Sequence, residues 1–149
     1  MQVKEQLIDA AMILSKTVEA MCIGEIGQAV CRYDVNVTVD AYLKNIKGKT
    51  ASLFSTACEL GAIEAGCGSD TVKKLKCFGE YLGIMFQFRD DLLDFTSSGA
   101  AEGKETHKDF HDGIYTLPVL KALEATEGRA ALLPIMRENA KRSLSAQEI

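Results

Sequence analysis

Four polar side chains recur at helical spacing within residues 86–95: Gln87, Asp90, Asp91 and Asp94. Positions i, i+3, i+4 and i+7 share one face of an α-helix, so this segment predicts a stripe of carboxylates. Three acids near the C-terminal end of a helix oppose its macrodipole, each at a cost of roughly 0.3–1 kcal/mol. A divalent cation reverses this cost, and Mg²⁺ is typically held by one or two carboxylates, water and phosphate oxygens. The stripe therefore predicts a Mg²⁺ site for a phosphate-bearing ligand.

Two simpler interpretations of this acidic stripe exist. Acidic runs are usually solvated surface, but the helix is apolar nearly all round from Leu82 to Phe95, which predicts a buried central helix. Ion pairing of Asp90 or Asp94 with Arg89 or a lysine would account for one acid and not for three. Metal binding is therefore the favoured interpretation.

Two lysines in glycine-containing segments are candidates to complete a diphosphate site. Lys49 and Thr50 follow a glycine and offer a cation and a hydroxyl group, and Lys104 follows Gly103 shortly after the acids. The first pair is not a phosphate-binding P-loop, because Leu43 stands where the first glycine of that motif belongs. Each lysine alone is a weak signal, because lone lysines are usually solvated.

Histidine and cysteine give weaker indications of a metal site. His107 and His111 have the spacing of a zinc pair on a helix, but they span a predicted loop-to-helix boundary, which favours solvated side chains. The five cysteines are odd in number and form no CxxC pair, which argues against a disulfide framework or a zinc site. Reduced, mostly buried thiols in a cytoplasmic protein are expected.

Helices must position all of these residues. The only two prolines are Pro118 and Pro134, so the first 117 residues contain no proline break. Apolar residues recur at spacings of three and four, and no segment alternates as a strand would. We predict an all-α helical bundle in a single domain, with a kink near Gly48 and Thr38 as a helix cap. The predicted helices are 3–33, 39–65, 70–95, 112–126 and 129–141.

Composition excludes several classes of partner. The net charge is −4 and no basic stripe is present, which argues against nucleic acid. The apolar runs are too short to span a bilayer. Charges at Lys4, Glu5 and Asp9 leave no visible signal peptide.

Taken in order, these segments resemble the trans-isoprenyl (polyprenyl) diphosphate synthases. The stretch Gln87-x-x-Asp90-Asp91-x-x-Asp94 resembles their second aspartate-rich motif. The corroborating segments are Gly24-Glu25-x-x-Gln28, Tyr42 with Lys49-Thr50, Gly103-Lys104, Asp109 and Gly113-Ile114-Tyr115-Thr116-Leu117-Pro118. Three features depart from the family: no first aspartate-rich motif precedes Gly24, the chain is about half the usual length, and Ile114 stands where many relatives have lysine.

The resemblance implies a partial isoprenoid synthase fold and a Mg²⁺-dependent condensation of isopentenyl diphosphate with an allylic diphosphate. It implies Asp90 as a direct metal ligand, with Asp91 and Asp94 acting directly or through metal-bound water. Lys49 and Lys104 would bind the allylic diphosphate, with Gln87 and Thr50 near the reacting carbons. A homodimer or a complementing subunit is expected, as part of a larger synthase domain.

Two other functions are compatible with the same residues. One is a non-catalytic helical subunit or interaction module that retains the diphosphate and Mg²⁺ half-site. The other is a terpene cyclase, which the Lys49-Thr50 pair and the segment from Gly103 to Pro118 disfavour relative to chain elongation.

Overall fold

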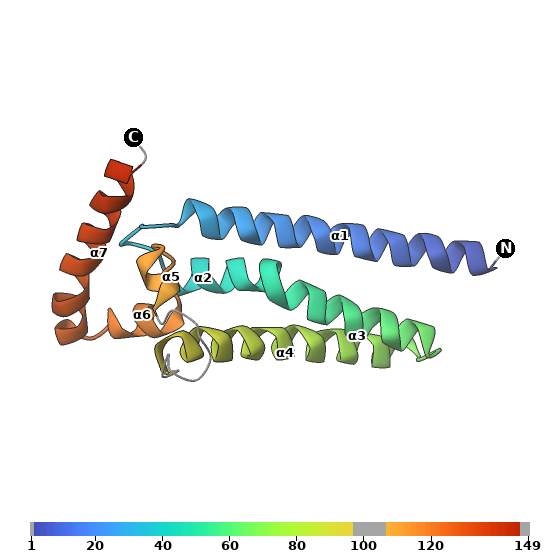
Figure 1. Ribbon diagram of the computed structural model, residues 1–149. Helices are drawn as coiled ribbons and strands as arrows, with labels where there is room; N and C mark the ends of the chain where they lie inside the picture. The colour runs from blue at the N-terminus through green and yellow to red at the C-terminus, as the bar shows by residue number, and fades with distance from the viewer. Residues whose placement is uncertain (1, 97–106, 147–149) are drawn as a thin grey trace. The chain divides into compact units, whose positions relative to one another are not determined.

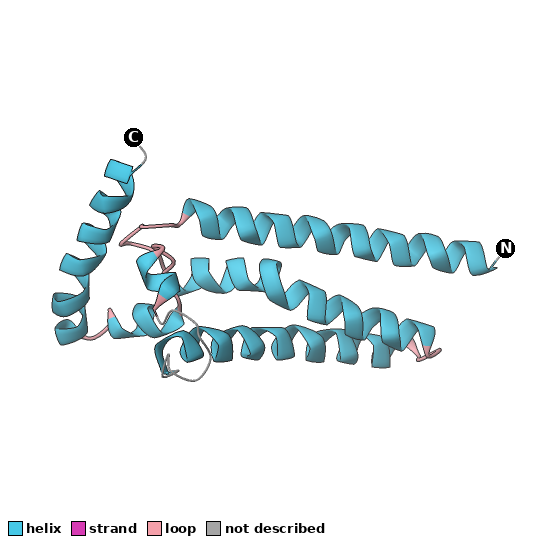
Figure 2. Ribbon diagram, viewed as in Figure 1, coloured by secondary structure: helices cyan, strands magenta, loops and turns pink. Residues whose placement is uncertain are grey.

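The computed structural model describes residues 2–96 and 107–146, and this part of the chain contains helices and no strand (Figure 2). The predicted all-α class is therefore confirmed. Figure 1 shows the elements in chain order: α1 (Gln2–Val30), α2 (Val39–Ile46), the π-helical turn η1 (Lys47–Ala51), α3 (Ser52–Glu64), α4 (Ser69–Thr96), α5 (Lys108–His111), α6 (Leu117–Ala122) and α7 (Thr126–Ala146).

The helices form two compact units. The first unit comprises the described residues of Met1–Gly27 and Leu43–Gln87. The second comprises those of Gln28–Tyr42 and Phe88–Ile149. The expected single domain stays a prediction.

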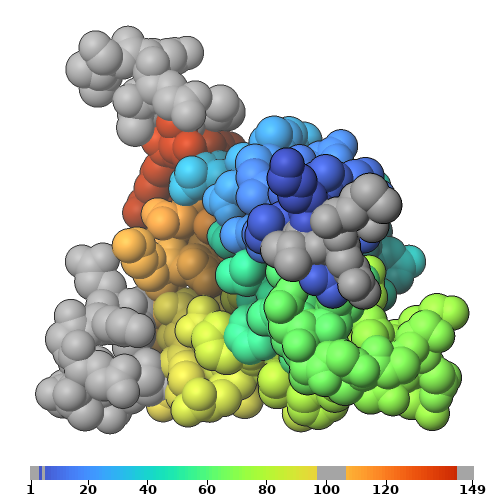
Figure 3. All heavy atoms as spheres, turned by 90° about the vertical axis from the view of Figure 1, so that its right-hand side faces the viewer, coloured from blue at the N-terminus to red at the C-terminus, as the bar shows by residue number. Residues whose placement is uncertain are grey.

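In the first unit, α1, α3 and α4 lie side by side and meet at small or hydroxyl-bearing residues (Figures 1 and 3). The hydroxyl oxygens of Thr17 and Thr56 are 2.6 Å apart and share a hydrogen bond between α1 and α3. The Ser55 hydroxyl donates a 3.0 Å hydrogen bond to the carbonyl of Lys76 in α4. At Gly79, an added Cβ would lie 2.5 Å from the carbonyl oxygen of Phe54. Backbone contact between α3 and α4 therefore depends on this glycine.

The kink expected near Gly48 is the π-helical turn Lys47–Ala51. This turn packs against α1 at backbone distance, because two glycines face each other. A Cβ on Gly48 would lie 2.6 Å from the carbonyl oxygen of Ala20, and a Cβ on Gly24 would lie 2.3 Å from the backbone nitrogen of Lys49. Single π-helical turns inside longer helices are frequent at functional sites.

In the second unit, hydrogen bonds join the segment after α1 to the segment after α5. The backbone N–H of Tyr33 donates to the carbonyl of Gly113 at 2.8 Å, and Arg32 Nε donates to the carbonyl of Asp112 at 2.9 Å. Thr38 accepts a 3.1 Å hydrogen bond from the N–H of Ala41 at the start of α2. This confirms the predicted helix cap.

Several helix boundaries differ from the predicted ones. The predicted helix 112–126 is confined to Leu117–Ala122, because Gly113 has φ +75° and Thr116 is extended before a proline in the first turn. The predicted helix 129–141 is longer, Thr126–Ala146, and Pro134 lies inside it. The first helix ends three residues earlier than predicted, at Val30.

Two predictions about burial are wrong. In the C-terminal part of α4, which was expected to be buried all round, Met85 is 67% exposed and Leu92 is 52% exposed. The five cysteines are free thiols as expected, but none is buried, and Cys22 and Cys77 are exposed. Apolar side chains favour burial, but they stay exposed where no other part of the chain packs against them. Separately, none of the helices among the described residues has the length and apolar character needed to cross a membrane.

Candidate functional site

The centre of the candidate site in the second unit is a buried carboxylate with a tyrosine partner. Asp91 in α4 is 2% exposed and Tyr42 in α2 is 5% exposed. The Tyr42 phenol donates a hydrogen bond to Oδ2 of Asp91, and its ring stacks on Phe88 with centroids 6.2 Å apart. Burial raises the pKa of Tyr42 far above its usual value, and the hydrogen bond and negative charge of Asp91 raise it further. The phenol therefore remains a protonated donor to this carboxylate.

The next carboxylate along α4 has an oxygen without a hydrogen-bond partner. Oδ1 of Asp94 accepts a 3.2 Å hydrogen bond from the backbone N–H of Lys108, and the backbone carbonyl of Asp94 accepts one from His107 at 3.1 Å. Oδ2 of Asp94 is buried and has no such partner among the residues that the structure describes. Buried carboxylate oxygens are normally satisfied, so this atom could accept a cation. Asp90 is exposed at the same end of α4.

These oxygen donors fit Mg²⁺ in type, although they do not form a complete cage. Within residues 2–96 and 107–146, no three histidine, cysteine, aspartate or glutamate side chains are gathered closely enough to hold a metal ion by themselves. Mg²⁺ rarely uses such cages, because it usually keeps several water ligands and takes one or two carboxylates together with phosphate oxygens. The orphaned oxygen of Asp94 and the carboxylate chemistry of Asp90 and Asp91 suit that mode of binding.

The first unit contains the predicted cation and hydroxyl group. Lys49 and Thr50 lie within the π-helical turn η1. The Thr50 hydroxyl donates a 2.7 Å hydrogen bond to Oε1 of Gln87. The ammonium of Lys49 lies 2.9 Å from Oε2 of Glu25 in α1. The other predicted lysine, Lys104, lies outside the described residues.

Helix α4 contains all four residues of the predicted polar stripe. It runs unbroken from Ser69 to Thr96, and Gln87, Asp90, Asp91 and Asp94 occur at spacings of three and four along it. Their shared helical face is therefore confirmed. The boundary of the two units falls between Gln87 and Phe88. The functional assignment of these residues stays a prediction.

Tyr42 and Glu25 occur within motifs that resemble those of the family, but the sequence predicts no role for either residue. Tyr42 is 49 residues from the carboxylate that it contacts, and Glu25 is 24 residues from Lys49. A contact between residues of different helices has no characteristic spacing in the sequence, so it cannot be predicted from spacing. The motif blocks were the only indication that these residues mattered.

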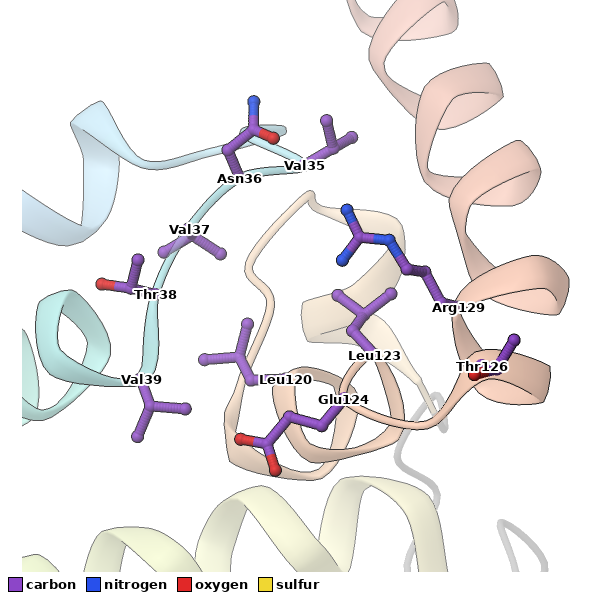
Figure 4. A pocket seen from close by; sticks show the side chains of 10 residues that line it. All are labelled: Val35, Asn36, Val37, Thr38, Val39, Leu120, Leu123, Glu124, Thr126 and Arg129. Carbon is purple, nitrogen blue, oxygen red and sulfur yellow. The ribbon is translucent and has the colours of Figure 1, made fainter.

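Other candidate places in the described part of the chain carry less chemistry. The ring of His107 lies against Phe95, with centroids 5.3 Å apart, and no zinc-binding cluster includes it. The second unit also contains an open cavity of about 570 Å³, shown in Figure 4. Half of its ten lining side chains are aliphatic, and the other half are polar, including one arginine and one glutamate. The lining residues are Val35, Asn36, Val37, Thr38, Val39, Leu120, Leu123, Glu124, Thr126 and Arg129.

The chain fits the prenyl diphosphate synthase class of protein. Its described part is helical, one helix face has a glutamine and three aspartates, and a π-helical turn has a lysine–threonine pair. The family model of polyprenyl synthetase matches residues 1–149. The chain belongs to the polyprenyl synthetase family.

Individual relatives agree with this assignment. The chain is 40% identical over 126 residues to heptaprenyl diphosphate synthase component 2 of Geobacillus stearothermophilus, covering 85% of this chain and 39% of the relative. It is 38% identical over 111 residues to octaprenyl diphosphate synthase of Escherichia coli, covering 74% of this chain and 34% of the relative. The chain thus spans less than half the length of these relatives.

Solved structures show the same helical arrangement. A decaprenyl diphosphate synthase from Rhodobacter capsulatus is 39% identical with a TM-score of 0.73, over 83% of this chain and 38% of that one. A polyprenyl synthase from Caulobacter crescentus, complexed with calcium and isoprenyl diphosphate, is 35% identical with a TM-score of 0.74. That match covers 82% of this chain and 38% of the other.

Proposed function

We propose that this chain supplies the allylic-diphosphate and Mg²⁺ binding residues of a prenyltransferase that condenses isopentenyl diphosphate with an allylic diphosphate. The observation that carries the proposal is the burial and hydrogen bonding of the carboxylates of α4. Asp91 is almost fully buried and accepts a hydrogen bond from Tyr42. Oδ2 of Asp94 is buried without a partner among residues 2–96 and 107–146. Isoprenyl diphosphate together with a divalent cation in the Caulobacter relative supports the choice of ligand.

The chemistry requires a diphosphate to leave from an allylic carbon with its bonding electrons. Mg²⁺ held by Asp90, Asp91 and Asp94 would neutralise negative charge on the diphosphate oxygens when bound. By resemblance to the family, Lys49 and Lys104 would bind diphosphate oxygens and stabilise the charge as it grows. The Thr50 hydroxyl donates a hydrogen bond to Gln87. The lone pairs of the Thr50 oxygen would then be available to stabilise an electron-poor carbon.

Binding of pyrophosphate with Mg²⁺ tests this proposal directly. Calorimetry should show binding by the unsubstituted chain, with a rise in the thermal unfolding temperature because the ligands bind the folded state. Asp90→Asn should abolish both effects. Asp70→Asn is the matched control, because Asp70 is an exposed aspartate at the other end of α4 that pairs with Lys74. Equal responses from the two variants would refute the metal assignment.

A second candidate function is a non-catalytic component that retains the half-site. It is favoured by one relative, whose own name calls it a component of a heptaprenyl diphosphate synthase. Incorporation of labelled isopentenyl diphosphate into an allylic primer separates the two candidates. Condensation by the chain alone supports the enzyme. Binding without condensation, with activity restored by a second polypeptide, supports the component.

A further inference from the structure

The contact between Glu25 and Lys49 suggests how a diphosphate could be exchanged. The Glu25 carboxylate lies 2.9 Å from the Lys49 ammonium, so the proposed anion-binding cation has a negative partner within the chain. The two side chains are 61% and 39% exposed, respectively. Ion pairs in such partly solvated positions are weak, because water competes for both charges. A diphosphate with several charges would therefore displace the carboxylate easily.

Close packing of the backbones of α1 and η1 brings Glu25 and Lys49 near each other. Gly24 precedes Glu25 and packs against the backbone of Lys49, where a Cβ would come within 2.3 Å of its nitrogen. Gly48 precedes Lys49 and faces Gly24. A Cβ added to Gly48 would lie 3.1 Å from the Cα of Gly24. Gly24 and Glu25 on α1 thus lie opposite Gly48 and Lys49 on η1. This close approach of the backbones brings the Glu25 and Lys49 side chains within reach of each other.

We propose that Glu25 is a positioning residue that acts as an exchangeable counterion for Lys49. Before the diphosphate binds, Glu25 holds the ammonium at the π-helical turn. When the diphosphate binds, its oxygens replace the carboxylate, and when pyrophosphate leaves, Glu25 pairs with Lys49 again. Glu25 thereby weakens pyrophosphate binding and favours its release after each condensation. This inference rests on the proposed function, because it takes Lys49 as a ligand of the diphosphate.

A neighbouring ion pair provides a matched control. Lys47 lies on the same π-helical turn and its ammonium is 3.2 Å from Oε1 of Glu80, with side chains that are 52% and 43% exposed. Glu25→Gln and Glu80→Gln each remove one negative charge beside a lysine of η1. Only the first should release a lysine that binds diphosphate. A general effect of net charge would appear equally in both variants.

The test is the dissociation constant of pyrophosphate in the presence of Mg²⁺, measured by calorimetry on the full chain. Glu25→Gln should tighten binding about two- to fivefold, which is the range expected for losing a competing exposed ion pair. A residue with only a structural role would weaken binding when replaced. Glu80→Gln should leave the constant unchanged. In a Lys49→Gln background, Glu25→Gln should have no effect.

The outcomes separate this inference from the proposed function. Unchanged or weaker binding by Glu25→Gln, in a chain that binds pyrophosphate through Lys49, would overturn the inference alone. Tightening of the same size in Glu80→Gln, or in the Lys49→Gln background, would also overturn it. A lack of pyrophosphate binding by the unsubstituted chain would overturn the proposed function, and the inference with it.

Discussion

The phenol of Tyr42 donates a hydrogen bond to Oδ2 of Asp91, and the two side chains are 5% and 2% exposed. A buried carboxylate needs such donors, because removal from water costs several kcal/mol if its oxygens remain unsatisfied. Asp91 is also the centre of the acidic stripe on α4. Tyr42 therefore stabilises a carboxylate whose burial is costly for folding and which we propose as a metal ligand.

Replacing Tyr42 with phenylalanine tests this support. Tyr42→Phe retains the ring beside Phe88 and removes only the hydroxyl, so the buried Asp91 carboxylate loses a donor. We expect a loss of about 1–3 kcal/mol in the free energy of unfolding, measured in urea. Tyr81→Phe is the control, because Tyr81 is 62% exposed and its replacement should change stability little. Equal effects of the two substitutions would contradict a special role for the Tyr42 hydroxyl.

Alkaline pH should destabilise the chain through the same tyrosine. Burial raises the pKa of Tyr42 above the value of 10.0 that it has when unfolded. Its contribution to stability is therefore complete below pH 10.0 and is lost as the pH rises above that value, where the unfolded chain releases the proton. Urea unfolding at increasing pH should show this decline, and Tyr42→Phe should reduce it. Tyr115, whose pKa burial also raises, should account for part of the remaining slope. An undiminished slope in Tyr42→Phe would exclude Tyr42 as the cause.

Local signals in the sequence predicted most of the helices. Thr38 was identified as a cap from its type and place before an apolar run, and its hydrogen bond to Ala41 depends on nothing more distant. The glycine at position 48 indicated a kink, although the sequence did not specify a π-helical turn. The helix expected at 112–126 failed because the positive φ of Gly113 interrupts it, even though Pro118 is a common start signal.

Contacts between helices could not be predicted in the same way. The four polar residues of α4 were found because their spacing is a property of one helix. The pairing of Glu25 with Lys49 depends on the approach of α1 to η1, which two glycines permit and no spacing reveals. The same reason explains why Met85 is exposed against expectation: the composition of α4 does not show which surface packs against it.

The approach of α1 to η1 leads to a prediction about Gly24. An added Cβ would lie 2.3 Å from the nitrogen of Lys49 and 2.6 Å from the carbonyl oxygen of Asn45, and both are backbone atoms. Gly24→Ala should therefore lower the free energy of unfolding by about 1–3 kcal/mol through overpacking. Gly61→Ala is the control, since Gly61 lies within α3 and no atom is within 4 Å of its added Cβ. That variant should gain up to about 1 kcal/mol from helix propensity. Destabilisation by Gly61→Ala, or none by Gly24→Ala, would contradict the close packing.

Self-association is expected through the exposed apolar face of α1. Ile8, Met12, Ile23 and Ile26 are 59%, 53%, 57% and 62% exposed, and their spacing puts them on one side of the helix. These residues form two apolar pairs, and the exposed Glu19 lies between them on the same side of the helix. Exposed apolar side chains favour contact with another protein, because covering them removes apolar area from water. Sedimentation velocity should therefore show a concentration-dependent dimer, and Met12→Glu should shift it towards the monomer. Ala65→Glu adds the same charge at the exposed end of α3 and should leave the dimer intact. A monomer at every concentration, or equal dissociation by both variants, would rule out α1 as the dimer contact.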